Sequence, residues 1–177
     1  MSHHQHLGRR ITGVLAGSVM IAGSLIACSA PAQAYSPDPT GHVYHRNTTD
    51  CPCSGGTLAD PFDGTYFAYD PGGVALKIEL NGHGNNWFVG KVEFHPLDEK
   101  LWVYDTRTDG DGFYVTLSYY RTDGRHIVLG NFTAPSTSAV ADKSVYNLSL
   151  PEGTLVTVRV YDDASRKDWI VTGEGKA

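Results

Sequence analysis

The stretch "GVALKIEL", residues 73–80, alternates two kinds of side chain, and this alternation decides the fold class. One set is aliphatic and consists of Val74, Leu76, Ile78 and Leu80. The other set consists of Ala75, Lys77 and Glu79. A period of two residues is typical of a β-strand, because successive side chains of a strand point to opposite faces. The stretch therefore predicts a strand with its aliphatic face toward a core.

Short segments of the same character follow one another along most of the chain. They cover residues 65–69, 87–94, 100–105, 113–120, 126–132, 144–150, 154–162 and 169–172. Clusters of Gly, Asp, Asn and Pro separate them, as expected for strands joined by turns. The pattern predicts an all-β fold: a single antiparallel β-sandwich, or a small barrel, of eight to nine short strands over residues 65–177.

One hairpin register follows from the residues of the loop "YYRTDGRHIV", residues 119–128. A two-residue turn would place Ile127 opposite Tyr120. A three-residue loop with a bulge places Ile127 opposite Tyr119 and keeps the aliphatic residues on one face. The bulged register is favoured because it also gives Gly124 the left-handed conformation that such a loop requires.

Residues 1–34 have the organisation of a secretory signal peptide. Arg9 and Arg10 precede an apolar run over residues 11–27, and "AQA" at residues 32–34 is typical of a cleavage site. Cleavage after Ala34 predicts a secreted, extracellular protein without a membrane span. A second interpretation stays open: residues 25–28, "LIAC", resemble a lipobox, in which Cys28 would carry a lipid anchor at the cell surface.

The charge balance argues against two classes of partner. The chain has 14 basic and 19 acidic residues, a formal net charge of −5, and loss of residues 1–34 takes this to −7. An acidic chain without a basic run is not expected to bind nucleic acid or an anionic membrane surface.

Residues 35–64 are Pro-rich and lack periodicity, which predicts a flexible leader outside the domain. They contain a cluster of four metal-ligand types: His42, His45, Cys51 and Cys53. Imidazoles and thiolates are ligands for zinc or copper, so a metal or redox site is one interpretation. The other is a local disulfide between Cys51 and Cys53, which an oxidising compartment favours.

The loop "DTRTDGDG", residues 105–112, is rich in carboxylates. Asp105, Asp109 and Asp111 are candidate calcium ligands, although Arg107 stands at the third position, where an EF-hand loop has Asp or Asn, and Thr116 at the twelfth, where it has Glu. Asp and Gly are also the residues that a tight turn uses.

Aromatic residues suggest a binding face. If residues 100–105 and 113–120 pair as a hairpin, one face carries Trp102, Tyr104, Tyr114 and Tyr120. Such a face is suited to stacking sugar rings or to binding a protein. Aromatic cross-strand pairs that only stabilise a covered sheet are the alternative.

The chain contains no catalytic or cofactor-binding motif, such as G-x-S-x-G, H-E-x-x-H or a phosphate-binding glycine loop. No spacing singles out a catalytic pair among four scattered glutamates: Glu79, Glu93, Glu99 and Glu152. We therefore expect no catalysis and no cofactor.

The segments "KLWVYDTRTDGDGFYVTLSYYR" and "VYNLSLPEGTLVTVRVYDD", within residues 100–163, resemble a type of small exported protein of high-GC Gram-positive soil bacteria. The resemblance implies export and a β-rich fold, and it implies no site residue.

Together these observations predict an exported, non-catalytic binding module for an extracellular glycan or protein. Two alternatives remain: a secreted inhibitor or toxin-like effector of another protein, and a metal-binding or redox protein that uses His42, His45, Cys51 and Cys53.

Overall fold

The computed structural model describes residues 35–55, 65–83, 87–135 and 142–177. Within these ranges the chain forms strands and one single-turn 3-10 helix, η1 (Thr48–Asp50). The strands are β1 (Thr40–Asn47), β2 (Cys53–Ser54), β3 (Tyr66–Phe67), β4 (Val74–Asn81), β5 (Phe88–His95), β6 (Lys100–Asp105), β7 (Tyr114–Tyr120), β8 (His126–Phe132), β9 (Asp142–Asn147), β10 (Leu155–Tyr161) and β11 (Trp169–Lys176). The predicted signal peptide lies outside the described residues, and no helix in the described part of the chain is long and apolar enough to cross a membrane.

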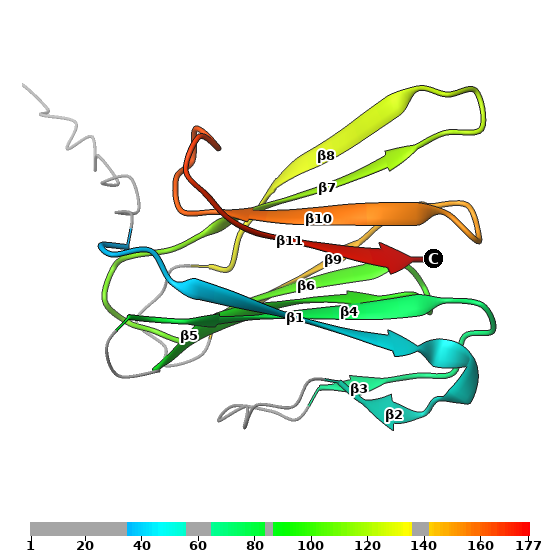
Figure 1. The fold of residues 1–177 in the computed structure, drawn as a ribbon, viewed down its shortest axis with the longest axis horizontal. Coiled ribbons are helices and arrows are strands. Elements are labelled where there is room, and N and C mark those ends of the chain that lie inside the picture. Colours follow the sequence, from blue (N-terminus) through cyan, green and yellow to red (C-terminus); the bar gives the residue numbers. More distant parts are fainter. Residues whose placement is uncertain (1–34, 56–64, 84–86, 136–141) are drawn as a thin grey trace, which may run out of the picture.

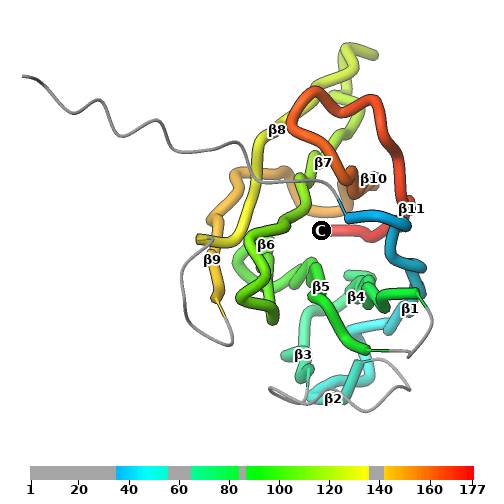
Figure 2. The backbone as a smooth tube through the Cα atoms, turned by 90° about the vertical axis from the view of Figure 1, so that its left-hand side faces the viewer, coloured from blue at the N-terminus to red at the C-terminus, as the bar shows by residue number. Residues whose placement is uncertain are grey.

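The prediction of an all-β antiparallel fold is confirmed. One nine-stranded sheet folds back on itself, so that two halves pack face to face (Figures 1 and 2). We call these halves the two sheets of the sandwich: one has the order β8-β7-β10-β11 and the other the order β1-β4-β5-β6-β9. They join at one seam, where Lys176 of β11 pairs with Val74 of β4. At the other seam the hydroxyl of Tyr146 on β9 donates to the carbonyl of Thr133 and accepts from its N–H, at 2.6 and 3.1 Å. The result is a nearly closed barrel flattened into a sandwich.

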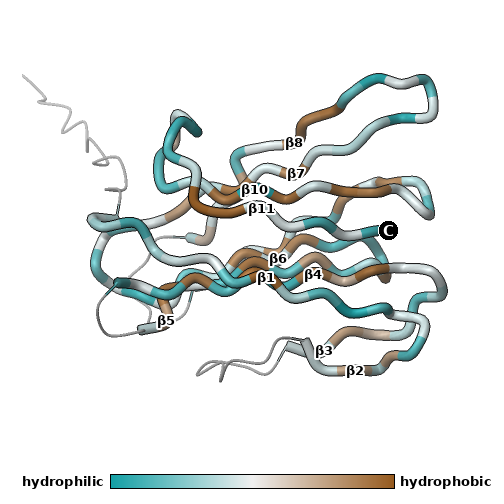
Figure 3. Tube along the Cα trace, viewed as in Figure 1, coloured by the Kyte–Doolittle hydropathy of each residue, from teal (hydrophilic) through white to brown (hydrophobic). Residues whose placement is uncertain are grey.

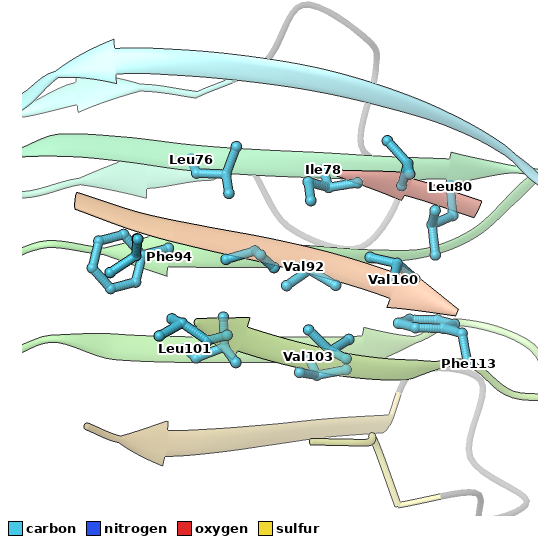
Figure 4. Close-up of a cluster of buried hydrophobic side chains, with 14 of the residues drawn as sticks. Leu76, Ile78, Leu80, Val92, Phe94, Leu101, Val103, Phe113 and Val160 are labelled. Atoms are coloured by element: carbon cyan, nitrogen blue, oxygen red, sulfur yellow. The ribbon is translucent and has the colours of Figure 1, made fainter. Parts of the chain in front are cut away.

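The core lies between the inward faces of the two sheets. Its buried aliphatic and aromatic side chains come from strands of both sheets and include Leu76, Ile78, Leu80, Val92, Phe94, Leu101, Val103, Phe113 and Val160 (Figure 4). Brown apolar segments accordingly follow the middle of the strands, whereas teal polar residues dominate the turns (Figure 3). The alternation in residues 73–80 is therefore that of a real strand, β4.

The bulged register of the β7–β8 hairpin is confirmed. Ile127 lies opposite Tyr119 and Leu129 lies opposite Leu117. Gly124 has a φ of 81°, the left-handed conformation that the loop requires.

The prediction of a flexible leader over 35–64 is wrong for residues 40–47. These residues form β1, which pairs with the whole of β4, from Thr40 opposite Asn81 to Asn47 opposite Val74. Residues Cys53–Ser54 and Tyr66–Phe67 form a separate, two-stranded sheet, which lies on the side of β4 and β5 away from β10 (Figure 2). The sequence misled because β1 is an edge strand with few apolar residues, and its partner β4 lies far along the chain.

Close approach of β11 to the opposite sheet depends on glycine. A Cβ atom at Gly175 would lie 2.9 Å from Cδ1 of Phe94 and 3.0 Å from the carbonyl oxygen of Val74. Because the second atom belongs to the backbone, the clash is not relieved by a side-chain rotation.

We expect Gly175→Val to lower the free energy of unfolding by about 3 kcal/mol or to prevent folding, because overpacking a core costs about 1–3 kcal/mol and backbone clashes add to this. Urea unfolding measures the effect. Glu174→Val, the same new side chain on the exposed face of β11, is the control and should change the midpoint little. Equal midpoints for the two variants would contradict this packing.

Candidate functional site

The four aromatic residues predicted to share one face are divided between the two sheets. The expected hairpin of residues 100–105 and 113–120 does not form: β6 pairs with β5 and β9, whereas β7 pairs with β8 and β10. Trp102 and Tyr104 therefore belong to one sheet and Tyr114 and Tyr120 to the other. Alternation assigned the faces of each strand, but it carries no information on which strands pair.

The outer face of β4, β5 and β6 is charged yet buried. Lys77 and Glu79 of β4 lie opposite Glu93 and Lys91 of β5, so that charge alternates along and across the strands. All four side chains are at most 2% exposed. The Nζ–Oε1 distance is 2.7 Å both from Lys77 to Glu79 and from Lys91 to Glu93. We call these four residues, together with His95, Trp102 and Tyr104, the covered face.

Glu93 is the most fully paired carboxylate of the covered face. A hydrogen bond of 2.9 Å joins its Oε2 to Nε2 of His95, and Thr65 donates to its Oε1. Burial alone would raise the pKa of Glu93, but the bond to His95 and the charge of Lys91 outweigh it and lower the pKa below its usual range.

Aromatic rings continue the covered face toward β9. His95 lies between the rings of Phe67 and Trp102, with centroid distances of 4.8 and 5.0 Å. Lys91 lies 4.4 Å from the centroid of Tyr104, and Lys143 lies 4.6 Å from that of Trp102. Cations placed over desolvated rings are stabilised by the ring quadrupole. The rings of Trp102 and Tyr104 therefore contact lysines of the protein itself.

Two groups of the covered face lack hydrogen-bond partners among the described residues: both carboxylate oxygens of Glu79 and the indole Nε1 of Trp102. Lys77 lies close to Glu79, but without the angle of a hydrogen bond. The lysines and glutamates neutralise one another in pairs, which supports a structural role for the covered face.

The candidate metal ligands in residues 42–53 are not brought together. Cys51 and Cys53 form a disulfide, as one of the two interpretations predicted, so their sulfurs are not thiolate ligands. His42 and His45 are three residues apart on β1 and therefore point to opposite faces of the strand.

Two of the three candidate calcium ligands accept hydrogen bonds within their own turns. Oδ1 of Asp105 accepts from the N–H of Arg107 at 3.0 Å, and Oδ1 of Asp109 accepts from the N–H of Asp111 at 3.1 Å. Among the described residues, three carboxylates gather elsewhere instead: Asp38, Asp162 and Asp168, with ligand atoms within 4.8 Å of one another.

Burial, helped by the charges of Asp109 and Asp142, raises the pKa of Asp105 to about 6.

The outer face of β7, β10 and β11 is partly exposed to solvent: Thr116 and Ser118 are buried, whereas Tyr120, Leu155 and Trp169 are exposed. Its register forms three rows across the strands: Ser118, Thr157 and Glu174; Thr116, Arg159 and Thr172; Tyr114, Tyr161 and Trp169. Tyr120, Leu155 and His126 extend it at the end of the first row. We call these residues the open face.

The open face has hollows at both ends, and Arg159 lines both of them. One hollow, of about 300 Å³, includes Tyr120, His126 and Glu174. The other lies beside Tyr161 and Trp169. Tyr120 is 70% exposed and Trp169 is 57% exposed, so both rings are available to a ligand. Sequence alternation indicated that Thr157 and Arg159 share a face, but it did not indicate their neighbours on β7 and β11.

Comparison of the chain with models of known protein families, with curated proteins and with solved structures finds no match.

We expect Lys91→Met to lower the free energy of unfolding by about 3–5 kcal/mol, because it leaves a buried carboxylate without its cation. The double variant Lys91→Met with Glu93→Gln should recover part of the loss. Lys100→Met is the matched control: its partner Asp98 is exposed, so a cost below about 1 kcal/mol is expected. If chemical denaturation gave equal losses for the two single variants, the covered face would not be a buried ion layer.

Asp105 predicts a dependence of stability on pH. Because its folded pKa of about 6 lies above the usual value of 3.8, its stabilising contribution is present below about pH 4 and is lost as pH rises through about 6. Asp105→Asn should thus gain stability relative to the unmodified protein between about pH 3.5 and 7, on the order of 1 kcal/mol after allowance for solvent screening.

Thermal unfolding across this range measures the gain. Asp123→Asn is the control, because Asp123 accepts from the N–H of Arg125 in a similar but exposed turn. Parallel pH profiles for Asp105→Asn and the unmodified protein would contradict the burial of this charge.

Proposed function

We propose that the protein is an exported binding module that holds an extracellular glycan on the open face. The observation that carries the proposal is the pair of hollows that meet at Arg159, each flanked by an exposed aromatic ring. Export is supported by the signal-like residues 1–34 and by the Cys51–Cys53 disulfide, since disulfides persist outside the cytoplasm.

The chemistry of the open face suits a carbohydrate. Rings such as Tyr120 and Trp169 offer flat apolar surface with a polar edge, which can stack on the C–H face of a sugar. Between them lie hydroxyls, a carboxylate and a guanidinium, which can bond to sugar hydroxyls. From Thr157 to Tyr161 the strand extends about 13 Å, so a ligand that reaches both ends would be an oligosaccharide or polysaccharide chain.

The residue types of the open face favour binding over glycoside hydrolysis. Hydrolysis generally uses two carboxyl groups on opposite sides of the scissile bond. Glu174 is the one carboxylate among the residues that line the two hollows. Arg159 holds its charge at any physiological pH and is suited to oriented hydrogen bonding.

The test is retention of the mature protein on a panel of polysaccharides and on a glycan array. We expect the double variant Tyr120→Ala with Trp169→Ala to weaken binding to a retained glycan about tenfold or more, because two stacking contacts are lost. Arg159→Ala should weaken it as well. Tyr66→Ala removes an exposed ring, 62% accessible, from β3 and should leave binding unchanged.

Two results would contradict the proposal. One is undiminished glycan binding by the double variant. The other is a protein that binds no glycan but co-purifies with an extracellular protein, a result that would favour the inhibitor or effector interpretation.

A further inference from the structure

Tyr35, the first residue after the predicted cleavage site, is anchored in the fold. Its side chain is 8% exposed and belongs to the main core cluster. Its backbone N–H donates a hydrogen bond of 3.0 Å to Oδ1 of Asp162, 127 residues away. Tyr35, the residue that cleavage after Ala34 would make the N-terminus, is therefore packed in the sandwich.

Asp162, which follows β10, is a buried carboxylate with unused capacity. It is 1% exposed, and its Oδ2 is buried without a hydrogen-bond partner. Its own N–H donates to the carbonyl of Asp168 at 2.9 Å, and this bond joins the two ends of the loop 162–168. Burial raises the pKa of Asp162 to about 6 despite the bond from Tyr35, and the negative charges of Asp38 and Asp168 contribute.

We propose that Asp162, with Asp38 and Asp168 beside it, is the binding site for the protein's own α-ammonium group at Tyr35. Hydrolysis of the Ala34–Tyr35 bond consumes one water, leaves a carboxylate on Ala34 and gives Tyr35 an amine that takes up a proton. This inference rests on the proposed export and is independent of the glycan face.

Cleavage would replace the Tyr35 amide by an ammonium group, which can pair with the buried carboxylate of Asp162. An amide N–H supplies one hydrogen bond and no charge, so Oδ2 remains unpartnered and three carboxylates face one another. An ammonium supplies three donors and a positive charge at the same position. A buried carboxylate that is paired and hydrogen-bonded costs far less than an unpaired one. Processing thus stabilises the folded domain.

Cleavage would thus stabilise the domain in addition to removing the signal peptide, residues 1–34. A precursor that still carries residues 1–34 packs Tyr35 in its core but lacks the ion pair, and it therefore folds less stably than the cleaved chain. The site favours the ammonium over a divalent cation because the Tyr35 nitrogen already stands at hydrogen-bond distance from Oδ1, and calcium requires six to eight oxygen ligands.

The experiment compares two forms of the domain, each released from a fusion by a protease that leaves no extra residues. One begins at Tyr35 and the other at Ala34. We expect the extra alanine to lower the folding equilibrium constant at least tenfold in urea unfolding at neutral pH. Asp162→Asn, made in both forms, should abolish this difference. Asp98→Asn removes the same charge from an exposed position and should preserve it.

A second measurement applies even where a variant is too unstable for urea unfolding. Acylation of the α-amine of the form that begins at Tyr35, followed by mass spectrometry, should be at least tenfold slower than for the form that begins at Ala34. Asp162→Asn should restore fast acylation.

Three results would overturn the inference: equal stability and equal acylation of the two forms; stabilisation of the Tyr35 form by added calcium that depends on Asp162, which would assign the site to a metal; and an exported protein whose intact mass retains residues 28–34, in which the Tyr35 amine never forms. The first two concern the site itself, whereas the third concerns the proposed processing.

Discussion

The structure depends on the burial of β4 on both of its faces. One face carries Leu76, Ile78 and Leu80 into the core, and the other carries Lys77 and Glu79 into an ion layer. Both faces of such a strand must be shielded from water. The sheet of β7, β10 and β11 packs over the apolar face, whereas the charged face is neutralised by Lys91 and Glu93 of the adjacent strand. In the observed register each of these residues lies opposite a residue of the other charge, whereas a shift of two residues would place Lys77 opposite Lys91.

Local pattern predicted most of the strands, and the reason is physical. Alternation of apolar and polar residues reports a half-buried strand, so β4 to β8, β10 and the start of β11 lie close to the predicted segments. The β7–β8 register was predictable because Gly124 and the face of Ile127 gave the same answer. What escaped prediction was non-local. β1 is defined by its pairing with β4, and β6 and β7 are neighbours in sequence that lie in different sheets.

The candidate site shows the same division between local and non-local information. Lysines and glutamates that alternate with aliphatic residues are typical of a solvated face, so the ion layer of Lys77, Glu79, Lys91 and Glu93 gave no sequence signal of burial. The open face is partly visible in the sequence, because alternation within residues 154–162 puts Thr157 and Arg159 on the face opposite Val156, Val158 and Val160. Its rings come from β7 and β11, which only the pairing brings beside Arg159. The Cys51–Cys53 disulfide was predictable because the two residues are almost adjacent in the chain.

The two outer faces of the sandwich therefore have opposite uses. The covered face uses charges and rings for the fold, including Trp102 and Tyr104, which the sequence suggested for binding. The open face keeps Tyr120 and Trp169 exposed at two hollows, and it is the surface that we propose meets a ligand. Docking of Tyr35 against Asp162 concerns how the mature domain is completed.

The central claim, that the open face is the ligand surface, is tested most directly by amide chemical-shift mapping of the mature protein during titration with a retained oligosaccharide. The account predicts that the largest shifts involve Tyr120, Arg159 and Trp169, with little change at Trp102 and Tyr104. Saturable shifts centred on Trp102 and Tyr104, with the amides of the open face unmoved, would contradict it.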